Sequence, residues 1–142
     1  MTGNAKIRHL LTRLSLAIVF IGIGIWEIIQ PSYWAMYVPP FVSSIMTADT
    51  FLMFHGAALI AIGTAVLLGI YLRFASALAA LTMLSIILSV TYYLGFSDIV
   101  LRDIAIFVIA VALFFDDSDY ARVARFRERG TLKYRNRLQT IE

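Results

Sequence analysis

The chain has 142 residues, of which 61% are apolar and only 15% are charged, and its formal net charge is +3 at pH 7. Soluble globular domains usually contain roughly 25% charged residues, so this composition excludes an ordinary soluble domain and favours an integral membrane protein. The sequence has no cysteine, which excludes a disulfide, a thiol nucleophile and a cysteine-ligated zinc or iron–sulfur site.

The first membrane segment is expected at Leu14–Ile29, an apolar run near the length that a spanning helix needs. The flank before it, residues 1–12, carries Lys6 and Arg8, and Arg13 directly precedes the run. The run lacks a convincing small-residue cleavage site, which favours a retained anchor over a signal peptide that is removed. We therefore expect this helix to stay in the mature protein, behind a basic flank.

The connection that follows, from Pro31 to Thr50, is longer than most helix connections and rich in aromatic residues. Its aromatic residues include Tyr33, Trp34 and Tyr37. Such residues anchor membrane proteins at the level of the lipid headgroups. The alternative is a lid over a cavity at the outer ends of the helices. The sequence leaves both interpretations open.

Two further membrane helices are expected at Phe51–Leu72 and Phe74–Phe96, because each run is near the roughly 20 residues that cross a bilayer. Arg73 lies between the two runs, which predicts a tight connection. Small residues such as Gly56 and Gly63 favour close helix packing, because in lipid the backbones themselves must approach one another.

The fourth predicted helix contains a pair of charged residues. Its uninterrupted apolar part, Ile104–Phe115, would cover roughly 18 Å, which is short of the roughly 30 Å hydrocarbon core. A spanning helix must therefore extend back to about Asp98 and carry Arg102 and Asp103 into the membrane. Ionisable residues at such a depth mark a functional site by default.

The positions of Lys and Arg predict the orientation of the helices. These residues gather in the N-terminal flank, at Arg73 and in residues 118–142, and the positive-inside rule makes those parts cytoplasmic. We expect an all-α integral membrane protein of the cytoplasmic membrane. Residues 13–117 would form a four-helix bundle with both termini cytoplasmic and a long outer loop between helices one and two. The basic tail, 118–142, is expected to be partly an amphipathic helix at the lipid surface, and it indicates no nucleic-acid binding.

Counting residues from the cytoplasmic ends brings four ionisable side chains to the outer half of the bundle: Glu27, His55, Arg102 and Asp103. Glu27 and Arg102 reach the same height, with Asp103 about 1.5 Å lower and His55 about 6 Å higher. One interpretation is a structural salt bridge in which Arg102 pairs with Glu27 or Asp103. Another is a ligand site, in which Arg102 donates to a carbonyl or anion while the acids and His55 exchange protons. Quinones and sulfur oxyanions both fit that description. A metal site is a weak alternative, because the residues follow no ligand spacing.

The fourth helix, with Leu101, Arg102, Asp103 and Ile104 in sequence, resembles the Arg-Asp helix of the DoxX-like family of small membrane proteins. The first helix agrees with that family through Arg13-Leu14, Phe20, Gly24 and the following Pro31. The four-helix length and the long first outer loop agree as well. The resemblance covers roughly residues 7 to 115 and leaves out the basic tail.

The resemblance implies a function in membrane redox chemistry. DoxX-like proteins are similar to the DoxD subunit of thiosulfate:quinone oxidoreductase, so the resemblance implies a quinone-side or accessory subunit of a membrane redox complex. It implies quinone as a non-covalent ligand, and other membrane subunits or further copies of the chain as partners in the lipid bilayer. The competing interpretation is a non-catalytic subunit that scaffolds a larger membrane assembly. Such a subunit needs no cofactor motif, and the sequence has none.

Overall fold

The computed structural model describes residues 3–116, and in this part of the chain it contains helices and no strand. The long helices are α1 (Gly3–Ile29), α3 (Ala48–Leu68), α4 (Leu72–Leu94) and α5 (Asp98–Phe114). Between α1 and α3 lie the short helix α2 (Pro31–Trp34) and two 3₁₀ helices, η1 (Ala35–Tyr37) and η2 (Pro40–Ser44). The predicted all-α class is thereby confirmed. The predicted tail helix falls outside the described residues.

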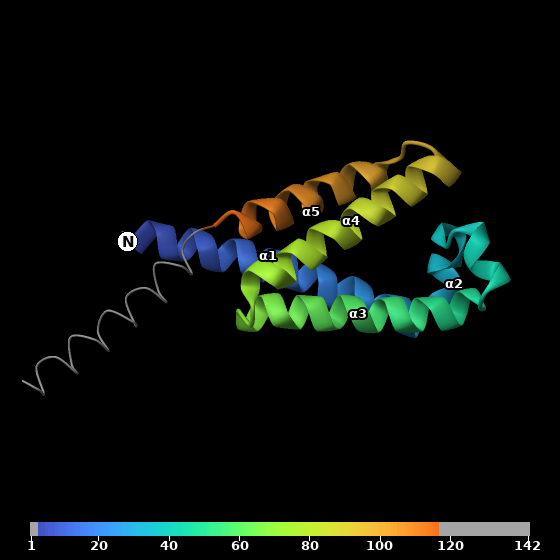
Figure 1. Cartoon of the computed structure of the whole chain (residues 1–142), viewed down its shortest axis with the longest axis horizontal. Helices are drawn as coiled ribbons and strands as arrows, with labels where there is room; N and C mark the ends of the chain where they lie inside the picture. The colour runs from blue at the N-terminus through green and yellow to red at the C-terminus, as the bar shows by residue number, and fades with distance from the viewer. Residues whose placement is uncertain (1–2, 117–142) are drawn as a thin grey trace, which may run out of the picture.

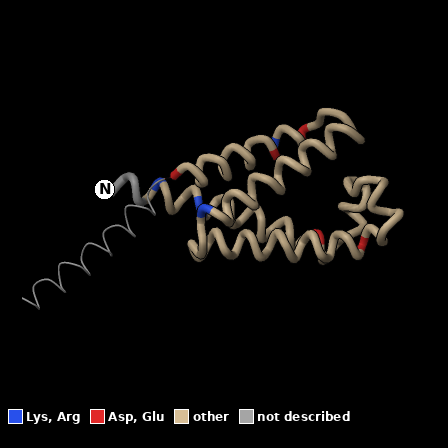
Figure 2. The backbone as a smooth tube through the Cα atoms, viewed as in Figure 1, with Lys and Arg blue, Asp and Glu red and all other residues tan. Residues whose placement is uncertain are grey.

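Three helices are long and apolar enough to cross a membrane: Ile7–Ile29 within α1, Ala48–Leu68 and Leu72–Leu94. They correspond to the three long apolar runs of the sequence. The fourth long helix, α5, begins at Asp98 and has 17 residues, so it includes the Arg102-Asp103 pair. Figure 2 shows that long stretches of all four helices carry no charged residue.

Local signals shift the ends of the predicted helices by a few residues. The helix α3 begins before Phe51 because Thr47 caps it, its hydroxyl accepting from the Thr50 amide at 3.3 Å. It ends at Leu68 because Gly69 adopts a left-handed conformation with φ of +71°. The helix α1 begins well before Leu14, so the basic flank is part of the first helix.

The long helices pack mainly as two pairs, α1 against α3 and α4 against α5. The described N-terminus, the α3–α4 turn and the end of α5 lie at one end of the molecule, as Figure 1 shows, whereas α2 and the α4–α5 turn lie at the other. All four helices contribute to the apolar core, which includes Leu16, Leu59, Ala79 and Leu113. Its members on α3, α4 and α5 lie mostly in the halves of those helices nearer the α3–α4 turn, whereas those on α1 lie around the middle of the helix.

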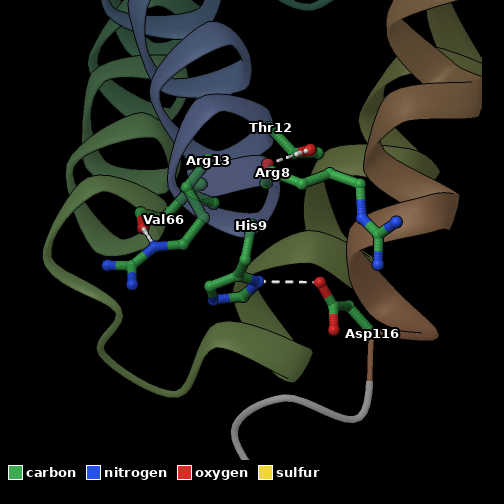
Figure 3. A network of polar contacts seen from close by, with 6 residues as sticks. All are labelled: Arg8, His9, Thr12, Arg13, Val66 and Asp116. Atoms are coloured by element: carbon green, nitrogen blue, oxygen red, sulfur yellow. Dashed lines mark hydrogen bonds and ion pairs between the residues drawn. The ribbon is translucent and has the colours of Figure 1, made fainter. Parts of the chain in front are cut away.

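Polar contacts tie the helices together at this first end (Figure 3). Arg13 on α1 donates from Nε to the Val66 carbonyl at 3.1 Å and from Nη2 to the Leu67 carbonyl at 2.8 Å. The last carbonyls of a helix have no partner within it, so a guanidinium there caps α3. His9 Nδ1 lies 2.8 Å from Asp116 Oδ2 and so links the start of α1 to the residues after α5.

Glycines allow α1 and α3 to approach at backbone distance. A Cβ atom on Gly56 would lie 2.6 Å from the Gly24 carbonyl oxygen, and a Cβ on Gly24 would lie 2.5 Å from the Gly56 oxygen. Gly63 meets Phe20 and Ala17 in the same way about two turns further along α3. The structure thus uses the small residues that the sequence marked for close packing.

We expect Gly56→Ala to destabilise the protein by about 1–3 kcal/mol, because the added methyl group must push the two helices apart. Gly22→Ala is the matched control, since a Cβ there meets no atom within 4 Å. The control should be neutral or stabilising by up to about 1 kcal/mol. Thermal unfolding of both variants in one detergent measures the difference. Equal effects of the two substitutions would contradict the close approach.

Candidate functional site

A cavity of about 720 Å³ lies between the two helix pairs, at the end of the molecule that carries the α1–α3 connection. All four long helices and the connection contribute to its wall. Most of the wall is apolar, with Leu59, Met83 and Ile86 among its residues. The predicted site residues on the wall are Glu27, Trp34, Tyr37, His55, Arg102 and Asp103. The cavity therefore brings together the four ionisable residues that the sequence placed in the outer half of the bundle.

Glu27 and His55 form the first polar pair on the wall. His55 Nδ1 on α3 and Glu27 Oε2 on α1 share a hydrogen bond of 2.7 Å. Glu27 is only 4% exposed, so its carboxyl group depends on this partner. The Phe51 ring stacks on the His55 imidazole with 5.6 Å between centroids, and this contact fixes the orientation of the imidazole plane. A carboxyl and an imidazole in hydrogen-bond contact can pass a proton between them.

Arg102 and Asp103, both on α5, form the second pair. Arg102 Nε donates to Asp103 Oδ1 at 2.9 Å, and Nη2 lies 2.9 Å from the same oxygen. Asp103 is buried, whereas the Arg102 side chain is 46% exposed. The guanidinium therefore keeps donor groups that Asp103 does not use.

These pairs correct one of the two salt bridges predicted for Arg102. The structure pairs Arg102 with Asp103 and Glu27 with His55, so the alternative of a Glu27–Arg102 bridge is wrong. Counting residues along a helix gives the height of a side chain but not the direction in which it points. Because α1 packs mainly on α3, Glu27 reaches His55 before it can reach α5.

The aromatic residues of the connection divide into two groups. Trp34 and Tyr37 lie on the cavity wall, and Trp34 is only 7% exposed. Tyr33 is 53% exposed and stacks on Trp26 at 5.0 Å between centroids. Edge contacts of Trp34 with Trp26 and Tyr33 join the two groups. The structure therefore places Trp34 and Tyr37 at the cavity and Tyr33 on the surface beside it.

The wall also contains the hydroxyl groups of Tyr92 and Tyr93, which the sequence places near the level of the charged residues, and of Ser89, which sequence reasoning missed. Ser89 precedes Tyr93 by four residues, so the two share a helix face, and that spacing is the signal that could have found it. Within residues 3–116, no group of three or more His, Asp or Glu side chains gathers in a way that could hold a metal ion.

The sequence was compared with known proteins. Residues 9–92, more than half of the chain, match the model of a protein family described as DoxX. The chain belongs to the DoxX family. Together with three helices able to span a bilayer, this makes it a DoxX-family membrane protein. No curated protein and no solved structure matches the chain. The DoxX match contains Glu27, Trp34, His55 and Ser89 but ends before the Arg102-Asp103 pair.

The pairing in this DoxX-family protein can be tested by double-mutant cycles. We expect Glu27→Gln and His55→Gln to be coupled by about 0.5–3 kcal/mol, because the two side chains are in direct contact. Glu27→Gln and Arg102→Gln should be additive within about 0.5 kcal/mol, since their partners differ. Unfolding in detergent gives all the free energies. A larger coupling for Glu27 with Arg102 than for Glu27 with His55 would show that the structural assignment of the pairs is wrong.

Proposed function

We propose that this DoxX-family protein binds the headgroup of a lipid-soluble quinone in the cavity and serves as a quinone-side or accessory subunit of a membrane redox complex. The observation that carries the proposal is a largely apolar cavity of about 720 Å³ whose wall holds the Glu27–His55 and Arg102–Asp103 pairs. Ligand sites typically have volumes of roughly 300–1,000 Å³, with apolar walls and a few polar groups that fix orientation. The shape and the lining both suit a quinone ring and the start of its isoprenoid tail.

The residues of the cavity have distinct tasks in this proposal. Arg102 is half-exposed on the wall and donates a hydrogen bond to a carbonyl oxygen, while Asp103 holds the guanidinium in place. Glu27 and His55 hold an exchangeable proton at the wall. A bound quinone would supply the capacity to take up electrons and protons. The electrons would come from a redox-active partner subunit, because this chain has no cysteine and no cofactor motif.

The proposal includes a topology. The four long helices form a transmembrane bundle in the cytoplasmic membrane, with α5 as the fourth crossing and the cavity toward the outer side. The helix α5 has 17 residues and would cover about 25 Å at 1.5 Å per residue. Local thinning of the bilayer accommodates a helix of that length. The Lys and Arg residues near the opposite end support cytoplasmic termini.

Single cysteines test this topology without interference, since the sequence contains none. We expect cysteines at Ser44 and Thr140 to react with a membrane-impermeant reagent from opposite sides of the membrane. Ser44 should label in intact cells and Thr140 only after the cells are opened. Labelling of both positions in intact cells would contradict the three crossings, α3, α4 and α5, that the proposal places between them.

Arg102→Lys should weaken quinone binding by tenfold or more, about 1.4 kcal/mol, while the protein stays folded. Lysine keeps the charge but loses the planar, two-pronged donor group that suits a carbonyl oxygen. Arg8→Lys, at the other end of α1, is the control and should bind like the parent. Quenching of tryptophan fluorescence by a short-chain quinone, with thermal unfolding on the same preparations, separates binding from stability. A loss of binding that only follows a loss of stability would refute the ligand site.

The second candidate function is a non-catalytic scaffold in a larger membrane assembly. It is favoured by the extensive packing of four helices through small residues and by the many basic residues of the sequence after Asp117. Purification in mild detergent distinguishes the two functions. Quinone that remains with the isolated chain supports the redox subunit, whereas a stoichiometric protein partner without quinone supports the scaffold.

A further inference from the structure

We propose that the indole N–H of Trp34 and the hydroxyl of Ser89 are the groups that hold an uncharged oxygen acceptor of the ligand, so that the cavity selects a neutral carbonyl compound over an oxyanion. This inference rests on the proposed function, because it assigns specificity within the same cavity. It names two residues from different elements, one in α2 and one in α4, that face the same space.

Both groups are buried polar atoms without a hydrogen-bond partner. Trp34 Nε1 and Ser89 Oγ are inaccessible to water, and within the described residues neither has a donor or acceptor in range. Trp34 as a whole residue is only 7% exposed. Buried polar atoms are nearly always bonded, and each exception calls for an explanation. A ligand acceptor in the adjoining cavity provides one. A ligand oxygen is about as large as a water oxygen, so each side chain must turn toward the cavity when the ligand binds.

Equivalent groups elsewhere in the protein are satisfied. Trp26 lies against Trp34, yet its Nε1 donates to Gln30 Oε1 at 2.9 Å. Ser85, one helical turn before Ser89, donates to the Thr82 carbonyl at 2.8 Å. A tryptophan of α1 and a serine of α4 thus find partners within the chain. Ser85 also lines the cavity, so the lack of a partner distinguishes Ser89 from another hydroxyl on the same wall.

The charges of the wall argue for a neutral ligand. The positive charge of Arg102 is balanced by Asp103, and Glu27 is paired with His55. The four residues together carry a net charge of zero, or of −1 when His55 is neutral. A sulfur oxyanion would therefore lose its hydration in an apolar cavity without meeting a net positive charge, which is unfavourable. A quinone carbonyl loses far less on leaving water.

The indole nitrogen sets a further condition on the ligand. It is a donor only, so the ligand must present an acceptor at that point, whereas the Ser89 hydroxyl can donate or accept. A quinone carbonyl or a ring methoxy oxygen meets this condition. An aliphatic tail does not, and it would leave both groups without a partner.

The test compares Trp34→Phe and Ser89→Ala with the matched controls Trp26→Phe and Ser85→Ala. The probes are a decyl-substituted benzoquinone and thiosulfate, added to the full chain in detergent. We expect each of the first two variants to raise the Kd for the quinone roughly three- to tenfold, as the loss of one hydrogen bond does. The controls should bind like the parent, and thiosulfate should not bind at all.

Thermal unfolding without ligand supplies a second readout that a purely structural role would not give. Ser89→Ala removes an unsatisfied buried hydroxyl, so it should raise Tm by roughly 2–4 °C. Ser85→Ala removes a satisfied hydroxyl and should not raise Tm. Weaker binding in a more stable protein is the expected combination for Ser89→Ala, and it cannot result from unfolding.

The possible outcomes separate this inference from the proposed function. If the parent binds the quinone and both Trp34→Phe and Ser89→Ala bind it equally well, the donors are wrongly assigned while the quinone site stands. If the parent binds thiosulfate in preference to the quinone, the selection for a neutral ligand is refuted. If the parent binds neither probe, the proposed function and the inference fail together.

Discussion

The close approach of α1 and α3 determines where the polar groups of this protein lie. Gly24 and Gly56 bring the two backbones together, and Gly56 directly follows His55 while Gly24 is one turn before Glu27. The contact therefore sets both the separation and the rotation of the two helices at the Glu27–His55 hydrogen bond. In lipid, where apolar side chains gain little by leaving the solvent, such backbone contacts and interhelical hydrogen bonds are what fix helices in register.

The two ends of the molecule differ in how tightly the helices pack. At the end near the α3–α4 turn, all four helices meet around an apolar core, and Arg13 binds the last carbonyls of α3. At the other end the wall is shared by helices and the aromatic connection, and a cavity of about 720 Å³ remains. The tight end makes the four helices one unit. The other end is less tightly packed and leaves room between the helix pairs.

The sequence predicted the helices well because apolar runs near the length of a bilayer have few other structures available in lipid. It predicted that Glu27, His55, Arg102 and Asp103 lie toward the same end of the helices for a related reason, since helical rise is constant. It could not predict their partners, which depend on which helices pack together. The connection was the least predictable part: Tyr33 and Trp34 are neighbours, yet one is exposed and the other buried. A short irregular segment has no period from which its buried face can be inferred.

Ser89 shows why a functional group can be invisible in a sequence and plain in a structure. Serine is common in membrane helices, where its hydroxyl usually bonds to the backbone of the preceding turn, as Ser85 does. In the sequence only the tyrosine four residues after Ser89 distinguishes the two serines. Natural chains satisfy their buried polar atoms, and the places where they fail to do so are expected at functional sites. In this protein Trp34 and Ser89 depart from that rule at the wall of one cavity, beside the Glu27–His55 and Arg102–Asp103 pairs. Each polar atom without a partner lowers the stability of the folded protein, and in our proposal a bound ligand supplies the missing hydrogen bond.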